Sequence, residues 1–433
     1  MNSILLTRNS TFIIGPVALV LGKIMEGIFY VIDAIGIPNI GLAIILFTIV
    51  VNLLMLPLTV KQQKFSKLSA KISPEVQAVQ AKYKGKTDQQ SQMAMNSEVQ
   101  GVYAKYGVSP TGSCLYLLIQ MPILFALYRV IYSMPAYVTK IGDTFRVLAD
   151  KIISTDNAEF LRNSGSATIN SVINTYGKSM NSGELQNGIV DVLNKLSTSD
   201  MNLISSHYQL SDLTYNGQLI LSNDTTRGLI DTYNNFLGIN IGNSPSYMVK
   251  EALATGAYLM VIVALIIPVL SAVTQWINVK LMPQQNDQNN MNDQAAAMAS
   301  SMKTMNMVMP LISAFFCYTM PSGMGLYWVA GSVVRSIQQV VINKHIDKMD
   351  FDEIIKKNEG KSAKKMEKLK ANQEKMAGYA NLNTKSIQKN ANMSAKATVK
   401  DVNDSQTETK SAKSGSMMAK ANMVKEFNEK NNK

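Results

Sequence analysis

The feature that most constrains the fold is a set of long apolar runs that carry almost no charge. A helix of about 20 mainly apolar residues crosses the ~30 Å hydrocarbon core of a bilayer. Hydrophobic residues make up 46% of the chain and charged residues only 17%. The sequence therefore predicts an all-α multi-span membrane protein with five transmembrane helices, at residues 38–60, 112–135, 251–277, 304–320 and 322–343. The last two form one apolar stretch broken at MPSGMG, where Pro321 and Gly323 predict a tight turn.

Lysine and arginine beside the runs predict the orientation, because cytoplasmic loops are enriched in these residues. The segment 61–110 has eight lysines against three acidic residues, and the tail 344–433 has twenty lysines against twelve acidic residues. The long loop 136–250 has eight basic and ten acidic residues. We therefore expect the first segment and the tail in the cytoplasm, the long loop outside, the N-terminus outside and the C-terminus inside.

Residues 1–37 contain a further apolar region with a different pattern. Lys23, Glu26 and Asp33 are spaced by three and seven residues, so they share one face of a helix. Such a helix lies in the membrane interface more readily than it crosses the bilayer. A signal peptide is the alternative, but the basic start is weak and no small-x-small cleavage site is evident. We expect an uncleaved interfacial helix.

Residues 61–111 predict an antiparallel helical hairpin. Ser73, Pro74 and Glu75 resemble a helix start, and Asp88 or Thr87 a second one. Each helix then carries an apolar stripe: Val76, Val79 and Tyr83 on the first, and Met95, Val99, Val102 and Tyr106 on the second. A plain linker is the alternative.

The remaining segments are polar. The loop 136–250 predicts a small, mainly helical external subdomain, with disorder as the alternative. The cytoplasmic loop 278–303 contains a low-complexity stretch. The tail 344–433 is rich in Lys, Asn and Ser, so we expect it to be disordered beyond a short helical start. Its charge suits anionic lipids or RNA phosphates, although a solubilising tail fits equally well.

Motifs of metal or nucleophile chemistry do not occur in the sequence. It contains no HExxH, paired CxxC, Walker loop or GxSxG. Cys114 and Cys317 lie in or beside apolar runs and are expected to be small buried hydrophobes, and His207 and His345 are far apart. We therefore predict a non-enzyme with no catalytic residue, no metal site and no cofactor.

Three polar residues inside the apolar runs lie at matched depths. Asn52 and Arg335 each precede the cytoplasmic end of their run by eight residues, and Gln120 lies at a similar depth. At 1.5 Å per residue this is about 12 Å from the inner boundary. Thr48 and Ser332 lie about one turn further out.

An arginine at this depth costs ~2.5–3.5 kcal/mol on insertion scales. The arrangement is therefore consistent with a hydrated cavity in the inner leaflet. The alternative is that Arg335 snorkels to the inner headgroups while Asn52 pairs with Gln120.

Four stretches carry a resemblance to a known family. They are GLAIILFTIVVNLLMLPLTVKQQKFSKLSAKISPEVQAVQAKYKGK, YGVSPTGSCLYLLIQMPILFALY, NFLGINIG and MPSGMGLYWVAGSVVRSIQQ. In this order they resemble the YidC/Oxa/Alb family of membrane protein insertases, in the form found in Gram-positive bacteria. The LPLTVKQQ, LIQMPILFALY and GLYW segments together are specific to it.

The resemblance implies an insertase of the bacterial plasma membrane that uses no nucleotide and that inserts and helps fold nascent membrane proteins, alone or with the Sec translocon. A hydrophilic groove, open to cytoplasm and lipid, would receive the polar end of a nascent span, and the apolar part would slide along spans three and five. It implies groove residues Thr48, Asn52, Gln120, Ser332 and Arg335, slide or bundle-core residues Pro268, Tyr327 and Trp328, and hairpin residues Pro74, Tyr83, Asp88 and Tyr103. The implied partners are nascent membrane proteins, the Sec translocon, the ribosome through residues 344–433, and anionic lipids.

The chain departs from the family pattern in two ways. Relatives usually carry an arginine at the position of Asn52, and Arg335 stands where they usually have an apolar or small residue. We hypothesise that the groove's cation has moved from span one to span five. The second departure is the long outer loop, which puts any carry-over to residues 140–235 in doubt.

Two other functions compete with insertion. A lipid or solute transporter predicts acidic residues inside the spans, whereas Glu251 lies only at an outer edge. A ribosome-recruiting scaffold predicts that deletion of residues 345–433 abolishes function, whereas an insertase keeps part of its activity.

Overall fold

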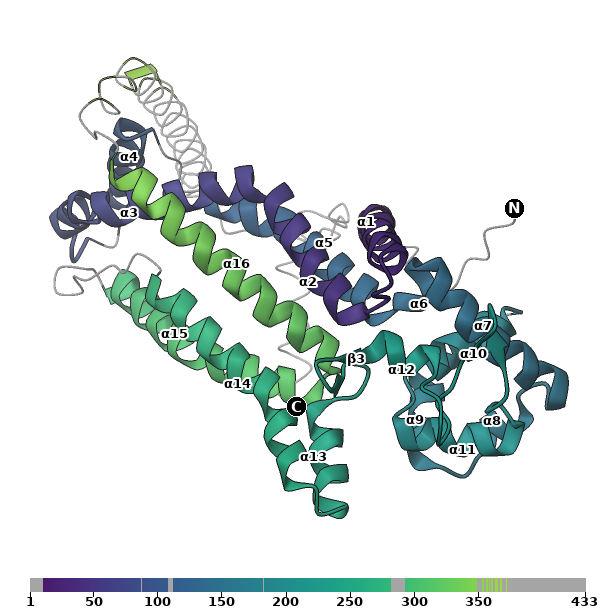
Figure 1. Ribbon diagram of the computed structural model, residues 1–433. Helices are drawn as coiled ribbons and strands as arrows, with labels where there is room; N and C mark the ends of the chain where they lie inside the picture. Colours follow the sequence, from purple (N-terminus) through teal and green to yellow (C-terminus); the bar gives the residue numbers. More distant parts are fainter. Residues whose placement is uncertain are drawn as a thin grey trace, which may run out of the picture. The chain divides into compact units, whose positions relative to one another are not determined.

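The computed structural model of the chain describes residues 11–348, except 87, 108–111, 182 and 282–292, together with a few scattered residues between 353 and 371. The described part is mostly helical (Figure 1), which confirms the expected all-α class. Its strands form two short antiparallel hairpins, β1 with β2 and β3 with β4.

The helices follow the order of the apolar runs. The membrane-type helices and the hairpin are α1 (Ile14–Ala34), α2 (Ile40–Leu54), α3 (Leu56–Lys82), α4 (Gln89–Lys105), α5 (Gly112–Tyr132), α14 (Tyr258–Leu281), α15 (Asp293–Thr319) and α16 (Ser322–Asp347). The segment between α5 and α14 holds α6 (Met134–Tyr137), α7 (Thr139–Asp156), α8 (Glu159–Arg162), α9 (Ala167–Tyr176), a 3-10 turn (Gly177–Asn181), α10 (Leu185–Leu193), α11 (Thr198–Tyr208), β1 (Thr214–Tyr215), β2 (Gln218–Leu219), α12 (Leu229–Asn234), β3 (Asn235–Phe236), β4 (Ile239–Asn240) and α13 (Pro245–Ala254).

Length and apolar composition single out one of the described helices, α14, as able to cross a membrane by itself. Helix α2 and the start of α3, residues Ile40–Ser69, qualify only as a bent pair. The apolar parts of α5 and α15, Leu118–Tyr132 and Thr304–Thr319, are shorter. Helix α16 carries too many polar residues to qualify in the described part. The five-span arrangement therefore stays a prediction.

The first predicted span is not one straight helix. Helix α2 ends at Leu54, and the chain bends by 62° before α3 continues. Pro57 explains the bend, because it has no N–H to donate to the carbonyl of Leu53 and its ring would clash there. The prediction of a helix start at Ser73 is also wrong, because α3 runs through Pro74 to Lys82 without a break.

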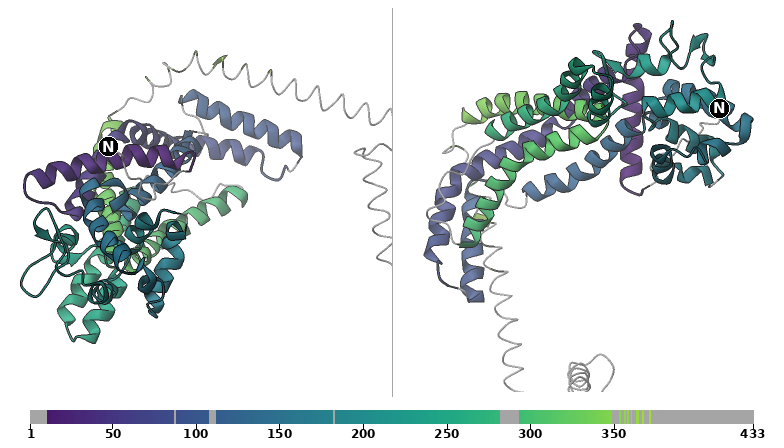
Figure 2. Two further views of the ribbon diagram at one scale, coloured as in Figure 1. Left: turned by 90° about the vertical axis from the view of Figure 1, so that its right-hand side faces the viewer. Right: turned by 90° about the horizontal axis from the view of Figure 1, so that it is seen from below.

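Helices α14, α15 and α16 lie side by side, and α16 also packs along α2 (Figures 1 and 2). The turn between α15 and α16 matches the break predicted at MPSGMG. Gly325 permits close packing, because a Cβ added there would lie 2.5 Å from Cγ2 of Ile267 on α14. The ring of Trp328 stacks on Phe316 of α15, with centroids 6.4 Å apart.

The segment 136–250 is mainly helical, and we call it the outer subdomain after the side of the membrane that the sequence predicts for it. Its buried side chains join those of α1, α2 and α5 in one apolar core. Backbone amides of the α15–α16 turn also bond to it: Ser322 donates to the carbonyl of Asn243, and Gly323 to that of Ile241, each at 2.9 Å. The outer subdomain therefore positions the start of α16.

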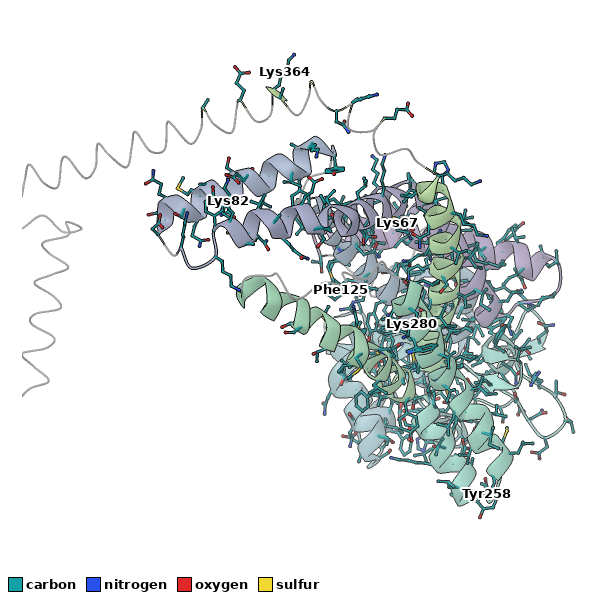
Figure 3. The ribbon with its side chains drawn as sticks, turned by 90° about the vertical axis from the view of Figure 1, so that its left-hand side faces the viewer. Lys67, Lys82, Phe125, Tyr258, Lys280 and Lys364 are labelled. Atoms are coloured by element: carbon teal, nitrogen blue, oxygen red, sulfur yellow. The ribbon has the colours of Figure 1, made fainter. Side chains whose placement is uncertain are left out.

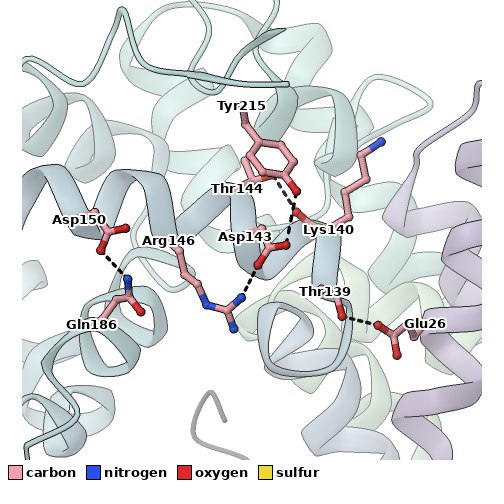
Figure 4. A network of polar contacts seen from close by, with 9 residues as sticks. All are labelled: Glu26, Thr139, Lys140, Asp143, Thr144, Arg146, Asp150, Gln186 and Tyr215. Carbon is pink, nitrogen blue, oxygen red and sulfur yellow. Dashed lines mark hydrogen bonds and ion pairs between the residues drawn. The ribbon is translucent and has the colours of Figure 1, made fainter. Parts of the chain in front are cut away.

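The charged stripe of α1 contacts this subdomain. Lys140 of α7 forms an ion pair with Asp33 at 2.7 Å. Figure 4 shows Thr139, the residue before it, donating to Glu26. Figure 4 also shows Asp143 joined to Arg146 and Tyr215 farther along α7. Lys23 remains exposed. Two of the three stripe residues are thus bound by protein, while Val20, Tyr30 and other apolar side chains of α1 are exposed.

Helices α3 and α4 pair as the expected hairpin, and polar contacts hold them together. Glu98 accepts from Lys82 and Tyr83 at 2.9 and 2.7 Å. At the other end Glu75 accepts from Lys105 at 3.3 Å and from Tyr106. The side chain of Cys114, residues 282–292 of the loop 278–303 and most of the tail 344–433 lie outside the described residues.

Two glycine substitutions test the close packing of α16. Gly325→Ala pushes a methyl group against Ile267, so we expect it to destabilise the protein by about 1–3 kcal/mol. Gly27→Ala is the matched control, because a Cβ there meets open space and alanine favours the helix by roughly 0.5–1 kcal/mol. Thermal unfolding in detergent measures both. Equal shifts of the unfolding temperature in the two variants would contradict close packing of α16 against α14 at Gly325.

Candidate functional site between α2, α14 and α16

Helix α16 carries polar side chains at intervals of three or four residues in the middle of the bundle. Such spacing places side chains along one side of a helix. Helix α14 contributes polar residues at the same contact. We call this set the polar seam; it consists of Gln275, Asn278, Ser332, Ser336 and Gln339.

Hydrogen bonds run along the polar seam from one helix to the other. The amide of Asn278 donates to the carbonyl of Ser332 at 3.1 Å and accepts from the hydroxyl of Ser336 at 2.8 Å. Ser332 donates to Oε1 of Gln275 at 3.4 Å, and Gln339 donates to the carbonyl of Leu281 at 2.9 Å. Asn278 and Ser332 are buried. Because buried polar groups are costly when unpaired, the seam fixes the register of α16 on α14.

The opposite side of α16 contacts α2. Gln338 donates to the backbone carbonyl of Asn52 at 3.1 Å. The amide of Asn52 donates back along its own helix to the carbonyl of Thr48 at 2.7 Å, and Thr48 donates to Ile44 at 2.6 Å. Thus Thr48 and Asn52 face α16, and α16 lies between α2 and α14.

Arg335 points along α16 toward the helix N-terminus. Its Nη2 donates to the hydroxyl of Ser332 at 3.2 Å, one turn earlier. If Asn343 marks the cytoplasmic end, as the charge pattern predicts, snorkelling requires the opposite direction. Among the described residues Arg335 is half-buried and has no ion pair. Within the described part of the bundle, it is therefore a cation without charge compensation.

The guanidinium lies at the level of Thr48 rather than Asn52. A Cβ added at Gly331 would lie 3.2 Å from Nη1 of Arg335 and 3.6 Å from Cγ2 of Thr48. Asn52 is level with Gln338, one turn nearer the other end of α16. The depth of about 12 Å counted for Asn52 along a straight helix does not apply, because the first run bends at Met55.

Two further observations concern the polar groups of this region. The side-chain oxygen Oε1 of Gln338 is buried and has no hydrogen-bond partner in the described part of the chain. Gln120, on α5, is half-buried and makes no hydrogen bond with Asn52 among the described residues. The alternative of an Asn52–Gln120 pair is therefore wrong.

The remaining predicted site residues mostly stabilise the fold. Pro268 is buried within α14, and Tyr327 packs against the apolar core. Tyr103 stacks on Phe65, with centroids 6.4 Å apart. Asp88 caps α4 by accepting from the amide of Ser91 at 2.8 Å, and this hydrogen bond lowers the pKa of the Asp88 carboxyl. No group of three or more metal-ligating side chains occurs in the described residues.

Gln275, Asn278 and Gln338 belong to the site, and the sequence reasoning missed them. A signal was present, because Gln275 and Asn278 are three residues apart near the end of an apolar run and thus share a helix face. They were overlooked because amides near a helix end ordinarily face the membrane interface.

Comparison with known proteins decides the family. A family model described as "60Kd inner membrane protein" matches residues 31–207 and 219–349, which is more than half of the chain. The chain belongs to this family. The matched residues include the polar seam, Arg335 and most of the outer subdomain.

Individual members of known function are similar to this chain over shorter stretches. Membrane protein insertase MisCA of Bacillus subtilis is 43% identical over 106 residues, which is 24% of this chain and 40% of the relative. Membrane protein insertase YidC 1 of Streptococcus pyogenes serotype M1 is 45% identical over 93 residues, 22% of this chain and 34% of the relative. Membrane protein insertase YidC 1 of Halalkalibacterium halodurans is 44% identical over 91 residues, which is 21% of this chain and 35% of the relative. The chain thus spans less than half the length of each.

A double-mutant cycle tests the polar seam. Asn278→Leu and Ser336→Ala each break a buried inter-helix hydrogen bond, so we expect each to destabilise the protein by about 1–3 kcal/mol. Because the two groups bond to each other, the double variant should lose about 0.5–1.5 kcal/mol less than the sum.

Thr274→Val is the control in the same helix. Thr274 bonds only to carbonyls of its own helix, so its loss should change stability by no more than about 0.5 kcal/mol. If the losses in the free energy of unfolding caused by Asn278→Leu and Ser336→Ala simply add in the double variant, the hydrogen bond between these residues in the polar seam is contradicted.

Proposed function

We propose that the chain is a membrane protein insertase and chaperone, and that the region around Arg335 receives the polar end of a nascent span. The observation that carries the proposal is an unpaired cation inside an apolar bundle of a 60Kd inner membrane protein family member. The relatives from Bacillus subtilis and Streptococcus pyogenes are named membrane protein insertases, which supports an insertion activity. No nucleotide or metal is required by this account.

The physical argument concerns the barrier to carrying a polar segment across lipid. A charged residue in hydrocarbon costs several kcal/mol, and a hydrated pocket part-way across shortens the path that the segment must cross dry. Arg335 adds an attraction for acidic groups, which is strong where water is scarce. The buried Oε1 of Gln338 lies farther along α16 and has no partner among the described residues, so it supplies an acceptor for water or for a donor of the client.

The proposed groove lies between α2, α5 and α16 and includes Thr48, Asn52, Gln120, Ser332 and Arg335. The apolar part of the client would leave along α14 and α16, whose outward faces expose apolar side chains. These are Ile262, Val269 and Val273 on α14, and Val333, Ile337 and Val341 on α16. Pro268, Tyr327 and Trp328 support this surface from behind.

The orientation is also part of the proposal. Figure 3 shows the labelled side chains of Lys67 and Lys82 far from that of Tyr258, with Lys280 between them. Tyr258 begins α14 and Lys280 lies in its last turn. This distribution supports a cytoplasmic side at the α3–α4 hairpin and an outer side at the outer subdomain.

We further propose that the protein acts in the bacterial plasma membrane as a multi-pass protein. The α3–α4 hairpin would recruit clients or the Sec translocon, and the basic tail 344–433 would contact the ribosome and anionic lipids. The hairpin residues Pro74, Tyr83, Asp88 and Tyr103 maintain the hairpin's shape in this scheme.

An insertion assay tests the role of Arg335. The client is a single-span protein with an acidic translocated tail, inserted into vesicles that contain the full-length chain. Arg335→Met should reduce insertion at least fivefold because the attracting charge is lost, and Arg335→Lys should retain part of it. Adding Asn52→Arg to Arg335→Met should restore insertion, because it returns a cation to the groove one turn away.

Arg227→Met is the matched control, since Arg227 is exposed and pairs with Asp231 on the outer subdomain. It should insert the client like the wild type. Wild-type insertion by Arg335→Met would show that the groove's cation has not moved to α16.

A further inference from the structure

A cavity of about 220 Å³ lies where the outer subdomain meets the ends of α2, α5 and α16. Several water molecules fit in this volume, because each takes about 30 Å³ in the liquid. Ile40 and Ile44 of α2, Ile131 of α5 and Met324 of α16 form an apolar part of the lining. The cavity is separate from the polar seam.

The opposite part of the lining is polar and carries a single charge. Lys195, which follows α10, is the only charged residue among the described residues that line the cavity. Its ammonium donates to the carbonyl of Tyr132 and lies 3.3 Å from the centre of the Tyr132 ring. The hydroxyl of Tyr132 lies 2.5 Å from that of Tyr176, and Asn194 and Asn234 complete this side.

Lys195 is surrounded by protein, and this changes its acidity. Burial lowers the pKa of Lys195 to about 7; Asp191 opposes the shift and Arg129 adds to it. Neither Asp191 nor Arg129 lines the cavity. An ammonium has three N–H donors, so donation to the Tyr132 carbonyl leaves two for a ligand.

The shape and chemistry of the lining select a class of ligand. A cation with hydroxyl and amide groups on one side suits an oxyanion, and lysine binds phosphate as a point charge. The apolar side suits a ligand with an attached apolar part. In the predicted orientation, the helix ends that line the cavity belong to the outer side of the membrane.

We propose that this cavity binds the phosphate of an anionic lipid headgroup through Lys195, with Tyr132, Tyr176 and Asn194 around it. The binding site does not depend on the insertase proposal. A bound lipid would join the outer subdomain to the ends of α2, α5 and α16.

Native mass spectrometry of the full-length protein in detergent tests the site. Phosphatidylglycerol is added and then washed out, and the retained lipid is counted. We expect the wild type to keep one phosphatidylglycerol, Lys195→Met to retain at least fivefold less, and Lys195→Arg to keep it. Phosphatidylcholine, whose headgroup is neutral overall, should be retained at least fivefold less than phosphatidylglycerol by the wild type.

Lys23→Met is the matched control, because Lys23 is an exposed lysine on α1 outside the cavity. It should retain the lipid like the wild type. Addition of sn-glycerol 3-phosphate identifies the source of the phosphate: binding of this compound to the wild type but not to Lys195→Met, without lipid retention, supports a phosphate site with a soluble ligand. Equal retention of phosphatidylglycerol by wild type and Lys195→Met, with no Lys195-dependent binding of glycerol 3-phosphate, would overturn the proposal.

The pH dependence gives a second readout that a merely structural lysine would not produce. An anion binds best to the charged ammonium, whose pKa in the empty site is about 7. Retention by the wild type should therefore fall as the pH rises from 6 to 9, while a phosphodiester stays ionised. Lys195→Arg should remove this dependence, because arginine keeps its charge over the whole range. Retention of phosphatidylglycerol by the wild type that does not change with pH would contradict a role for Lys195.

Discussion

The arrangement of the helices depends on how α16 pairs its polar side chains inside an otherwise apolar bundle. Asn278 supplies both a donor and an acceptor to α16, and Gln338 reaches from α16 to the backbone of α2. Each unpaired buried group would cost about 1–3 kcal/mol. These bonds therefore select one register among the many that apolar surfaces alone would permit. Arg335 lies on the same stretch of α16 and has no acidic partner among the described residues.

The outer subdomain constrains α16 from its other end. The carbonyls of Ile241 and Asn243 hold the α15–α16 turn, and the ion pair between Lys140 and Asp33 ties the subdomain to α1. Two independent attachments thus fix where α16 begins and which side chains it presents to α2. The outer subdomain thus positions the helical bundle, and it would also bind the ligand proposed at Lys195.

Much of the fold could be predicted from the sequence, because long apolar runs and charge clusters are strong signals. The helical class, the break at MPSGMG, the hairpin and the Asp88 cap follow from them. The bend at Met55 was missed because the run around Pro57 is apolar throughout, and a window average does not register a missing N–H. Pro74 misled in the opposite direction, because a Ser-Pro-Glu helix start also fits inside a helix that tolerates proline.

The candidate site was less predictable. Thr48, Asn52, Ser332 and Arg335 were identified because polar residues in apolar runs are rare, and the structure brings these four together. The depth of Asn52 was counted along a straight helix, whereas its run bends at Met55. Asn278 and Gln338 were missed because their partners are backbone and side-chain groups on other helices, and a single sequence does not identify such partners.

Site-specific photocrosslinking from α16 tests the central claim most directly. A crosslinker is placed at position 335, inside the proposed groove, or at position 311, whose leucine is exposed on α15. Ribosomes stalled on a single-span client with an acidic tail are then added. The account predicts crosslinks from position 335 to the polar tail, and few from position 311. Crosslinks to the tail from position 311 but not from position 335 would contradict it.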